Sequence, residues 1–207
     1  MKAKIKVAIQ GKKGSFHHIV AQRYFGNQLS LVTCETFDTS VRELLCNSVD
    51  LSVMAIENSI AGSIIPNYAL IDRNDLKIVG EYGLSINHNL MVLPGQIIDD
   101  IKEVHSHPMA LLQCKNNLQK YPSIVMVESE DTAEEAFRIS KDQIKGIGAI
   151  ASQEAADIYH LDILEHSIQS IKNNITRFVI IQKKGSLVSE DKINKASLKF
   201  TLDHQRG

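Results

Sequence analysis

Apolar strand-like runs alternate with helix-like patterns along most of this chain, and this alternation restricts the possible folds more than any other feature. In the first part of the chain, beginning with a strand, the patterns alternate in the order 5–9, 17–25, 29–34, 38–46, 51–56 and 64–71. Ser40 and Glu43 have the spacing of a capping box for the second helix. Strands and helices in this order are typical of a mostly parallel sheet covered on both faces. The sequence therefore predicts an α/β fold.

The alternation stops once and then begins again. Residues 76–80 and 84–93 read as two extended segments that leave the first unit, with Gly83 near their join. A second series, again beginning with a strand, follows at 101–104, 108–118, 124–127, 132–139, 147–151, 153–159 and 163–168. A last strand at 178–182 can return to the first unit. We therefore predict two similar α/β lobes with a cleft between them, formed by residues 1–80 with 174–184 and by residues 81–173.

The C-terminal residues suggest a further domain. Residues 196–202 alternate between apolar and polar side chains after a polar linker at 183–195. One strand without a partner cannot bury an apolar face. We therefore expect residues 185–207 to hold a linker and the first strand of a truncated domain.

Composition excludes several classes of partner. The chain has 23 Lys plus Arg and 24 Asp plus Glu, which gives no reason to expect nucleic acid or an anionic membrane as a partner. No apolar run approaches membrane-spanning length. Cys34, Cys46 and Cys114 are odd in number and far apart, which favours reduced thiols in the cytoplasm. The eight histidines show no metal-ligand spacing, so we expect no metal site.

Four polar segments follow or open strands and are candidates for a shared site. Each also has a purely structural interpretation, such as a turn or a helix cap, which is the more common one for a single segment. Four of them together in an α/β pattern favour a common ligand site. The segments are Gly11-Lys12-Lys13-Gly14-Ser15 with His18, Glu57-Asn58-Ser59 with Gly62, Ser106-His107-Pro108 with Gln113, and Asn174-Ile175-Thr176-Arg177-Phe178.

These four segments, in this order, resemble those of prephenate dehydratase. The similarity spans about residues 5–183, and the joint occurrence is far more specific than any single motif. Two positions depart from the family pattern, because Ala55 replaces a usual Pro and His17 stands where Ser is common. The resemblance implies two lobes of the type II periplasmic-binding-protein kind. It also implies a C-terminal ACT domain that binds phenylalanine, of which residues 197–202 would be the opening.

The resemblance implies removal of carboxylate and ring hydroxyl from prephenate, which gives phenylpyruvate without a cofactor. Thr176 is the implied proton donor or relay, with support from Glu57, and Arg177 is expected to hold a substrate carboxylate in two hydrogen bonds. Helix starts near Ser15, Ser59 and Ser106 are expected to contact anions. We expect catalytic roles for Thr176, Glu57, Ser106 and Gln113. We expect substrate contacts from Ser15, His18, Asn58, Ser59, Gly62, Asn174, Arg177 and Phe178.

Alternatives remain open at the level of sequence. Arogenate, which carries an amine in place of the ketone, is the nearest alternative substrate. A non-catalytic sensor of small molecules with the same fold is a different class, since fold does not fix function. The family also suggests a homo-oligomer. Because the ACT domain would be incomplete, we expect no phenylalanine effector site in this chain.

Overall fold

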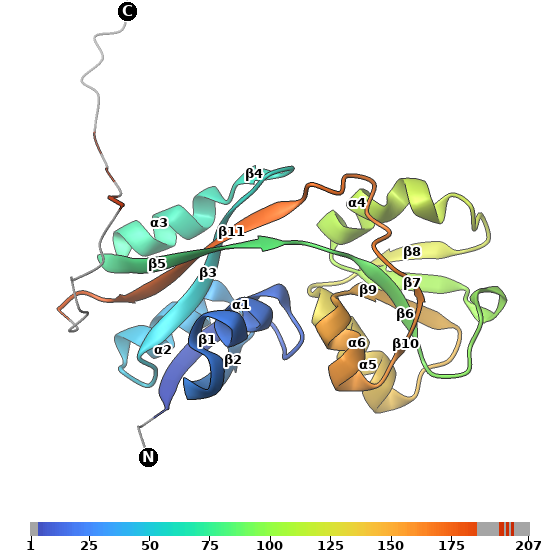
Figure 1. Ribbon diagram of the computed structural model, residues 1–207, viewed down its shortest axis with the longest axis horizontal. Helices are drawn as coiled ribbons and strands as arrows, with labels where there is room; N and C mark the ends of the chain where they lie inside the picture. The colour runs from blue at the N-terminus through green and yellow to red at the C-terminus, as the bar shows by residue number, and fades with distance from the viewer. Residues whose placement is uncertain (1–3, 186–194, 197, 199, 201–207) are drawn as a thin grey trace, which may run out of the picture.

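Two β-sheets form the centres of two lobes that lie side by side in this computed structural model (Figure 1). The structure describes residues 4–185, 195, 196, 198 and 200. The first sheet has the strand order β2-β1-β3-β11-β5, with β4 paired to β3. Its strands are β1 (Ile5–Gln10), β2 (Leu29–Cys34), β3 (Leu51–Asn58), β4 (Gly62–Ser63), β5 (Leu76–Ser85) and β11 (Ile175–Lys183). Its helices are α1 (Phe16–Phe25), α2 (Phe37–Leu45) and α3 (Ile65–Arg73), with a short 3-10 helix η1 (Gly26–Gln28).

The second sheet has the order β10-β6-β9-β7-β8. Its strands are β6 (Asn89–Val92), β7 (Glu103–Ser106), β8 (Val125–Glu128), β9 (Ile147–Ala151) and β10 (Asp162–Glu165). Its helices are α4 (Pro108–Leu118), α5 (Thr132–Asp142) and α6 (Gln153–Tyr159), with a 3-10 helix η2 (Ile98–Asp100).

The two sheets share one topology. In each, a central strand pairs in parallel with two others, β1 with β2 and β3, and β7 with β8 and β9. In each, an antiparallel strand then arrives from the other lobe, since β11 follows the second lobe and β6 follows β5. The prediction of two similar α/β lobes is therefore confirmed. The chain crosses between the lobes twice, at residues 86–88 and 166–174 (Figure 1).

Several predicted details differ from the structure. The boundary between lobes was expected after residue 80, but β5 continues unbroken through Gly80 and Gly83 and pairs with β11 as far as Ser85. The exact domain limits stay a prediction. The expected strand at 196–202 falls largely outside the described residues.

The predicted capping box of α2 is wrong. Thr36 caps the helix, because its hydroxyl oxygen accepts a hydrogen bond from the Thr39 amide at 3.1 Å. Ser40 lies inside the helix, is fully buried, and bonds through Oγ to Ser52 Oγ at 2.5 Å. A buried polar partner on the neighbouring strand thus decides the role of Ser40, and sequence spacing does not reveal it.

Helices cover both faces of the first sheet. Ile19 and Val20 of α1 pack with Phe178 and Leu84 on one face. On the other face, α2 and α3 pack against Val179 and its neighbours. Because adjacent strand residues point to opposite faces, Phe178 and Val179 belong to different halves of the core.

The loop after β1 is pressed against the second lobe. Gly11 and Gly14 belong to a segment that was expected to line the ligand site, but they let the backbone approach the other lobe. Gly14 has φ +85°, and a Cβ there would lie 2.7 Å from the Ala155 Cα. Ser152 Oγ donates to the Gly14 carbonyl at 2.6 Å, and Tyr159 Oη donates to the Lys13 carbonyl at 2.7 Å. These bonds fix the first lobe against α6.

Two buried histidines make stability depend on pH. Burial lowers the pKa of His17 from 6.5 to about 4, and burial is also the main reason that the pKa of His88 falls to about 4. Between these pH values the unfolded chain binds more protons than the folded chain, so stability is lost as the pH falls from 6.5 to 4. Each shift corresponds to about 3 kcal/mol.

We expect His17→Phe to remove about half of this pH dependence, because a phenyl ring fills the site between Phe37 and Phe178 without a titratable group. The measurement is the free energy of unfolding by urea at pH 7 and pH 4.5. The exposed His160 provides a control, and His160→Asn is expected to leave the slope unchanged. An undiminished pH slope in His17→Phe would contradict this assignment.

Candidate active site

A β-bulge in β3 decides which polar side chains meet. Thr176 pairs with Asn58 and Arg177 with Glu57, but Phe178 pairs with Ala55, so Ile56 is an extra residue. A bulge of this kind changes the alternation of faces along the strand. Thr176, two residues from Phe178, therefore lies with Asn58 on the face that α1 covers. Arg177 and Glu57 lie on the opposite face.

The side chain of Asn58 has one possible orientation. Its Oδ1 accepts hydrogen bonds from the backbone amides of Ile60 and Ala61 at 3.0 and 2.9 Å. A backbone amide can only donate, so the amide nitrogen Nδ2 must point the other way. It donates to Thr176 Oγ1 at 2.9 Å and to Asn174 Oδ1 at 2.7 Å. The Asn58 side chain thus supplies a hydrogen to the Thr176 hydroxyl oxygen.

The hydrogen bonds of this network continue into the second lobe, and their directions are fixed there too. Asn174 accepts through Oδ1, so its Nδ2 donates, and it reaches Gln113 Oε1 of α4 at 2.8 Å. His88 Nε2 lies 3.0 Å from that same oxygen. Asn174 is fully buried, and His88 and Thr176 are nearly so. A continuous network therefore joins Thr176 to His88 across both crossovers.

Sequence reasoning missed His88. The available clue was the polar run Asn87-His88-Asn89 between the apolar residues Ile86 and Leu90. The pattern at 84–93 predicts only an extended segment.

Glu57 and Arg177 belong to a different cluster. Arg177 Nε and Nη2 donate to Glu81 Oε2 at 3.0 and 2.8 Å, and Nη1 lies 3.6 Å from Glu57 Oε2. All three side chains are partly exposed. Glu57 is therefore not placed to support Thr176, contrary to our expectation from the sequence.

Other predicted site residues have structural partners. Ser106 is buried, and its Oγ donates to the Ile150 carbonyl at 2.7 Å within the second sheet. Phe178 is in the core, edge-on to the His17 ring. Ser59 lies in the β3–β4 turn, not at a helix start, and its Oγ accepts from the Ile175 amide at 2.9 Å. Gly62 follows in β4 with φ +81° and open space around its Cα.

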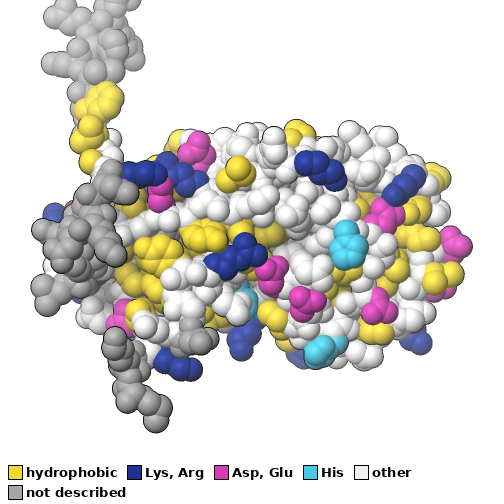
Figure 2. Space-filling view, in the orientation of Figure 1, with side chains coloured by type: hydrophobic (Ala, Val, Ile, Leu, Met, Phe, Trp, Pro, Cys, Tyr) yellow, Lys and Arg dark blue, Asp and Glu magenta, His cyan; other side chains and the backbone are white. Residues whose placement is uncertain are grey.

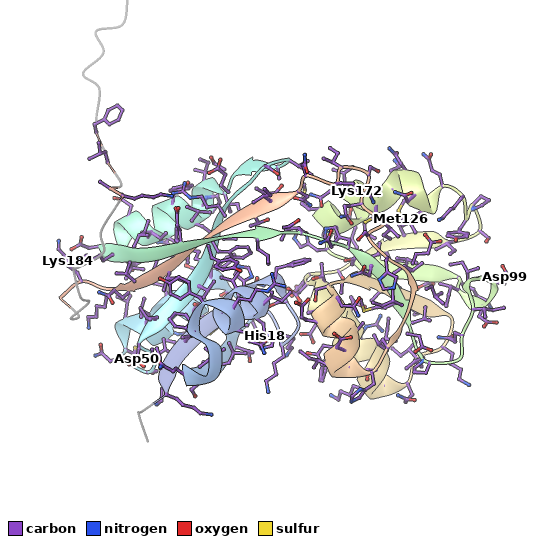
Figure 3. All side chains as sticks on the ribbon, in the orientation of Figure 1. His18, Asp50, Asp99, Met126, Lys172 and Lys184 are labelled. Atoms are coloured by element: carbon purple, nitrogen blue, oxygen red, sulfur yellow. The ribbon has the colours of Figure 1, made fainter. Side chains whose placement is uncertain are left out.

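Ser15 and His18 lie at the N-terminus of α1. Ser15 is the N-cap, with Oγ accepting from the His18 amide at 3.3 Å, and His18 Nδ1 accepts from the Gly14 amide at 3.0 Å. Burial, and secondarily Lys13, lowers the pKa of His18. His18 lies on the side of the first lobe that faces the second (Figure 3). The adjacent Phe16 ring meets the His88 ring edge-on, with centroids 5.6 Å apart, so this helix end adjoins the network.

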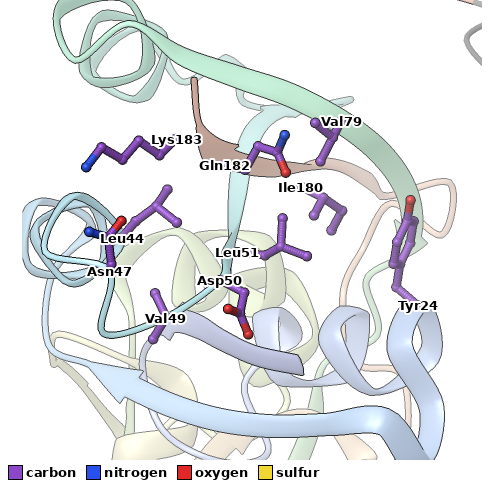
Figure 4. Close-up of a pocket in the computed structure, with 10 residues that line it drawn as sticks. All are labelled: Tyr24, Leu44, Asn47, Val49, Asp50, Leu51, Val79, Ile180, Gln182 and Lys183. Atoms are coloured by element: carbon purple, nitrogen blue, oxygen red, sulfur yellow. The ribbon is translucent and has the colours of Figure 1, made fainter. Parts of the chain in front are cut away.

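A surface pocket of about 430 Å³ lies elsewhere (Figure 4). Its lining includes Leu51, at the start of β3, and Gln182, near the end of β11. Asn58 and Thr176 are at the opposite ends of these strands, roughly 20 Å away. The pocket therefore contains none of the predicted site residues.

Charge is scattered over the visible surface. Figure 2 shows basic and acidic side chains interspersed on this face, with no single-sign patch. Within the part of the chain that the structure describes, no helix has both the length and the apolar character needed to cross a membrane.

The Thr176 hydroxyl oxygen already accepts a hydrogen from Asn58, so its own hydrogen is available to donate to a ligand. A model of the prephenate dehydratase family matches residues 7–186. The chain belongs to the prephenate dehydratase family. An arogenate dehydratase 2 from Petunia hybrida is 41% identical over 205 residues, which cover 99% of this chain and 52% of the relative. This prephenate dehydratase family member thus spans about half the length of that curated relative.

This prephenate dehydratase family member has the same fold as other proteins of solved structure. A prephenate dehydratase from Arthrobacter aurescens, in complex with L-Phe, superposes with a TM-score of 0.81 at 23% identity, over 90% of this chain and 63% of that one. A structure described as GqqA, a quorum quenching acylase, has a TM-score of 0.78 at 27% identity, over 89% and 66% of the two chains. The two-lobed α/β fold is therefore shared with known proteins.

Proposed function

We propose that this chain is the catalytic part of a prephenate dehydratase, a carbon–oxygen lyase that converts prephenate to phenylpyruvate, carbon dioxide and water. The observation that supports this most is the Thr176 hydroxyl, whose acceptor side is occupied by Asn58 Nδ2. Loss of the substrate carboxylate and ring hydroxyl makes the ring aromatic, which supplies much of the driving force. The protein then mainly has to help hydroxide leave.

Thr176 would assist the departing oxygen. A threonine hydroxyl is a weak acid, so its role is to present a hydrogen bond that strengthens as negative charge develops, and to position or relay a proton. Asn58 polarises the hydroxyl in the required direction by donating to its oxygen. The electron pair released with carbon dioxide enters the ring as hydroxide leaves, so the reaction needs no external oxidant or reductant and no redox cofactor.

The N-terminus of α1 is a candidate for binding a substrate carboxylate. Its first amides carry partial positive charge, and it adjoins the network through Phe16 and His88. The α4 N-terminus is capped by His107, whose Nδ1 accepts from the Met109 amide at 3.2 Å, so Ser106 is not its cap. Ser15 and His18 are therefore better placed for a substrate contact than Ser106.

The test is turnover by the purified chain. Prephenate and arogenate are supplied separately, and the aromatic keto acid or phenylalanine formed is followed by ultraviolet absorbance and chromatography. We expect turnover of prephenate, with arogenate as the alternative substrate because it differs only by an amine in place of the ketone. Binding without conversion of either compound would support a sensor and reject the lyase.

Arg177→Lys is expected to change KM by less than about twofold. The guanidinium is bonded to Glu81 and lies on the face away from Thr176, so a structural role is favoured. Steady-state kinetics check this, with Arg23→Lys, another partly exposed Arg beside a Glu, as the matched control. A tenfold rise in KM for Arg177→Lys alone would instead show that Arg177 holds a substrate carboxylate, as the sequence suggested.

Cellular location, oligomeric state and the response to phenylalanine are further parts of the proposal. We propose a cytoplasmic location, which is consistent with Cys34, Cys46 and Cys114 being free thiols. We also propose a homo-oligomer, measurable by light scattering. Phenylalanine is expected to have little effect on turnover by this chain. Strong inhibition at low phenylalanine concentration would place the effector site within these residues.

A further inference from the structure

The directions of the hydrogen bonds in the network around Thr176 determine the tautomer of His88. Gln113 Oε1 already accepts from Asn174 Nδ2 at 2.8 Å, and it is an oxygen because Asn174 must donate there. His88 Nε2 lies 3.0 Å from this oxygen, so Nε2 must carry a hydrogen. The two backbone amides at Ile60 and Ala61 can only donate, and they thereby fix the orientation of every amide side chain in the network.

The other ring nitrogen of His88 has no hydrogen-bond partner among the residues that the structure describes. Nδ1 is buried and makes no hydrogen bond. With Nε2 protonated and the ring neutral, Nδ1 is a lone-pair acceptor without a donor. Leaving a buried polar atom unsatisfied is costly, and such atoms require an explanation when they persist. Burial is the largest cause of the low pKa of His88, about 4, which keeps the ring neutral.

Contacts on several sides hold the His88 ring and backbone. The Phe16 ring meets the imidazole edge-on at 5.6 Å. The His88 backbone amide donates to Gln169 Oε1 at 3.0 Å, and its carbonyl accepts from the Ile168 amide at 2.8 Å. His88 therefore joins the first crossover, the second crossover and α4.

We propose that His88, as the neutral Nε2–H tautomer, is a positioning residue that fixes the Gln113 amide and, through Asn174 and Asn58, the direction of the Thr176 hydroxyl. Without a donor at His88, Gln113 can rotate its amide and present nitrogen to Asn174. Asn174 and then Asn58 can in turn exchange the positions of their amide oxygen and nitrogen, which reverses the direction of each hydrogen bond in the network. Asn58 resists this because of its two backbone donors, so the expected effect is partial. The catalytic part of this inference rests on the proposed function.

Two variants separate the donor from the packing. His88→Phe keeps a planar ring against Phe16 but has no N–H group. His88→Gln keeps an N–H donor that can reach Gln113. We expect His88→Phe to lower kcat about tenfold with KM changed less than about threefold, and His88→Gln to stay within about threefold of wild type. Melting temperatures are measured for both variants. Wild-type kcat in His88→Phe would overturn the proposal, as would equal losses in the two variants.

The tautomer is tested independently on the wild-type chain. Nitrogen-15 spectra of histidine-labelled protein at pH 7 distinguish the Nε2–H from the Nδ1–H form. The Nε2–H form is expected for His88, with the signal assigned from its absence in His88→Gln. An Nδ1–H form would overturn the inference. If the wild type turns over neither substrate, the proposed function fails, and the tautomer still decides whether His88 orients the network.

Discussion

Replacing Thr176 with valine should lower kcat about a thousandfold, the range typical of losing a positioned proton donor. Valine has nearly the same shape, so the buried site stays filled. Asn58 Nδ2 loses one acceptor but keeps Asn174 Oδ1, which limits the stability cost to about 1 kcal/mol. Steady-state kinetics with the better of the two substrates, together with a melting temperature, measure both effects.

Two further variants make the Thr176 result specific. Thr176→Ser keeps a hydroxyl beside Asn58 and should retain most of the activity. Thr33→Val makes the same substitution at an exposed position of β2 and should leave kcat unchanged. If Thr176→Val turned over substrate within threefold of wild type, Thr176 would not be the donor.

The second large effect is expected for Asn58→Asp, with kcat lowered about a hundredfold. The new carboxylate still accepts from the Ile60 and Ala61 amides, but its other oxygen now faces Thr176 Oγ1. Since an ionised carboxylate can only accept, the Thr176 hydroxyl must donate to it. The hydrogen intended for the substrate is thereby diverted, while the shape of the side chain is almost unchanged.

Asn74→Asp is the matched control for this change. Asn74 lies at the C-cap of α3, where its Nδ2 donates to the Leu70 carbonyl at 2.8 Å, and it has no contact with the network. It should keep wild-type kcat with a small loss of stability. Partial return of Asn58→Asp activity at low pH, where the carboxyl regains a hydrogen, would add support. Full activity of Asn58→Asp at pH 7 would contradict the proposed direction of the hydrogen bond.

Much of the fold could be predicted because it follows from local periodicity. The bounds of β2, α4, β9 and α6 agree with the sequence patterns at both ends. Side chains on one face recur every 2 residues in a strand and every 3.6 residues in a helix, so the spacing of the apolar residues indicates which of the two a segment forms. The return of the last strand to the first lobe followed from the same reasoning.

Parts of the candidate site could not be predicted, because they depend on tertiary register. The four polar segments were identified, but the bulge at Ile56 places Asn58 on the face covered by α1 and Glu57 on the other face, the reverse of what alternation from Ala55 gives. Simple alternation along β3 and β11 gives no indication of an inserted residue. Gly14 was expected near a ligand, yet Ala155 occupies that space. The place of His88 in the network depends on its contact with Gln113, a residue 25 positions away in the sequence, and no local pattern indicates this contact.

The position of the hydrogen on Thr176 tests the central claim most directly. Neutron diffraction from a deuterated crystal of this chain would locate the deuterons around Thr176 Oγ1. We predict a deuteron of Asn58 Nδ2 directed at Oγ1, and the deuteron of Thr176 itself directed away from both Asn58 and Asn174. A Thr176 deuteron directed at Asn58 would show that the hydroxyl is not free to donate, and would contradict the account.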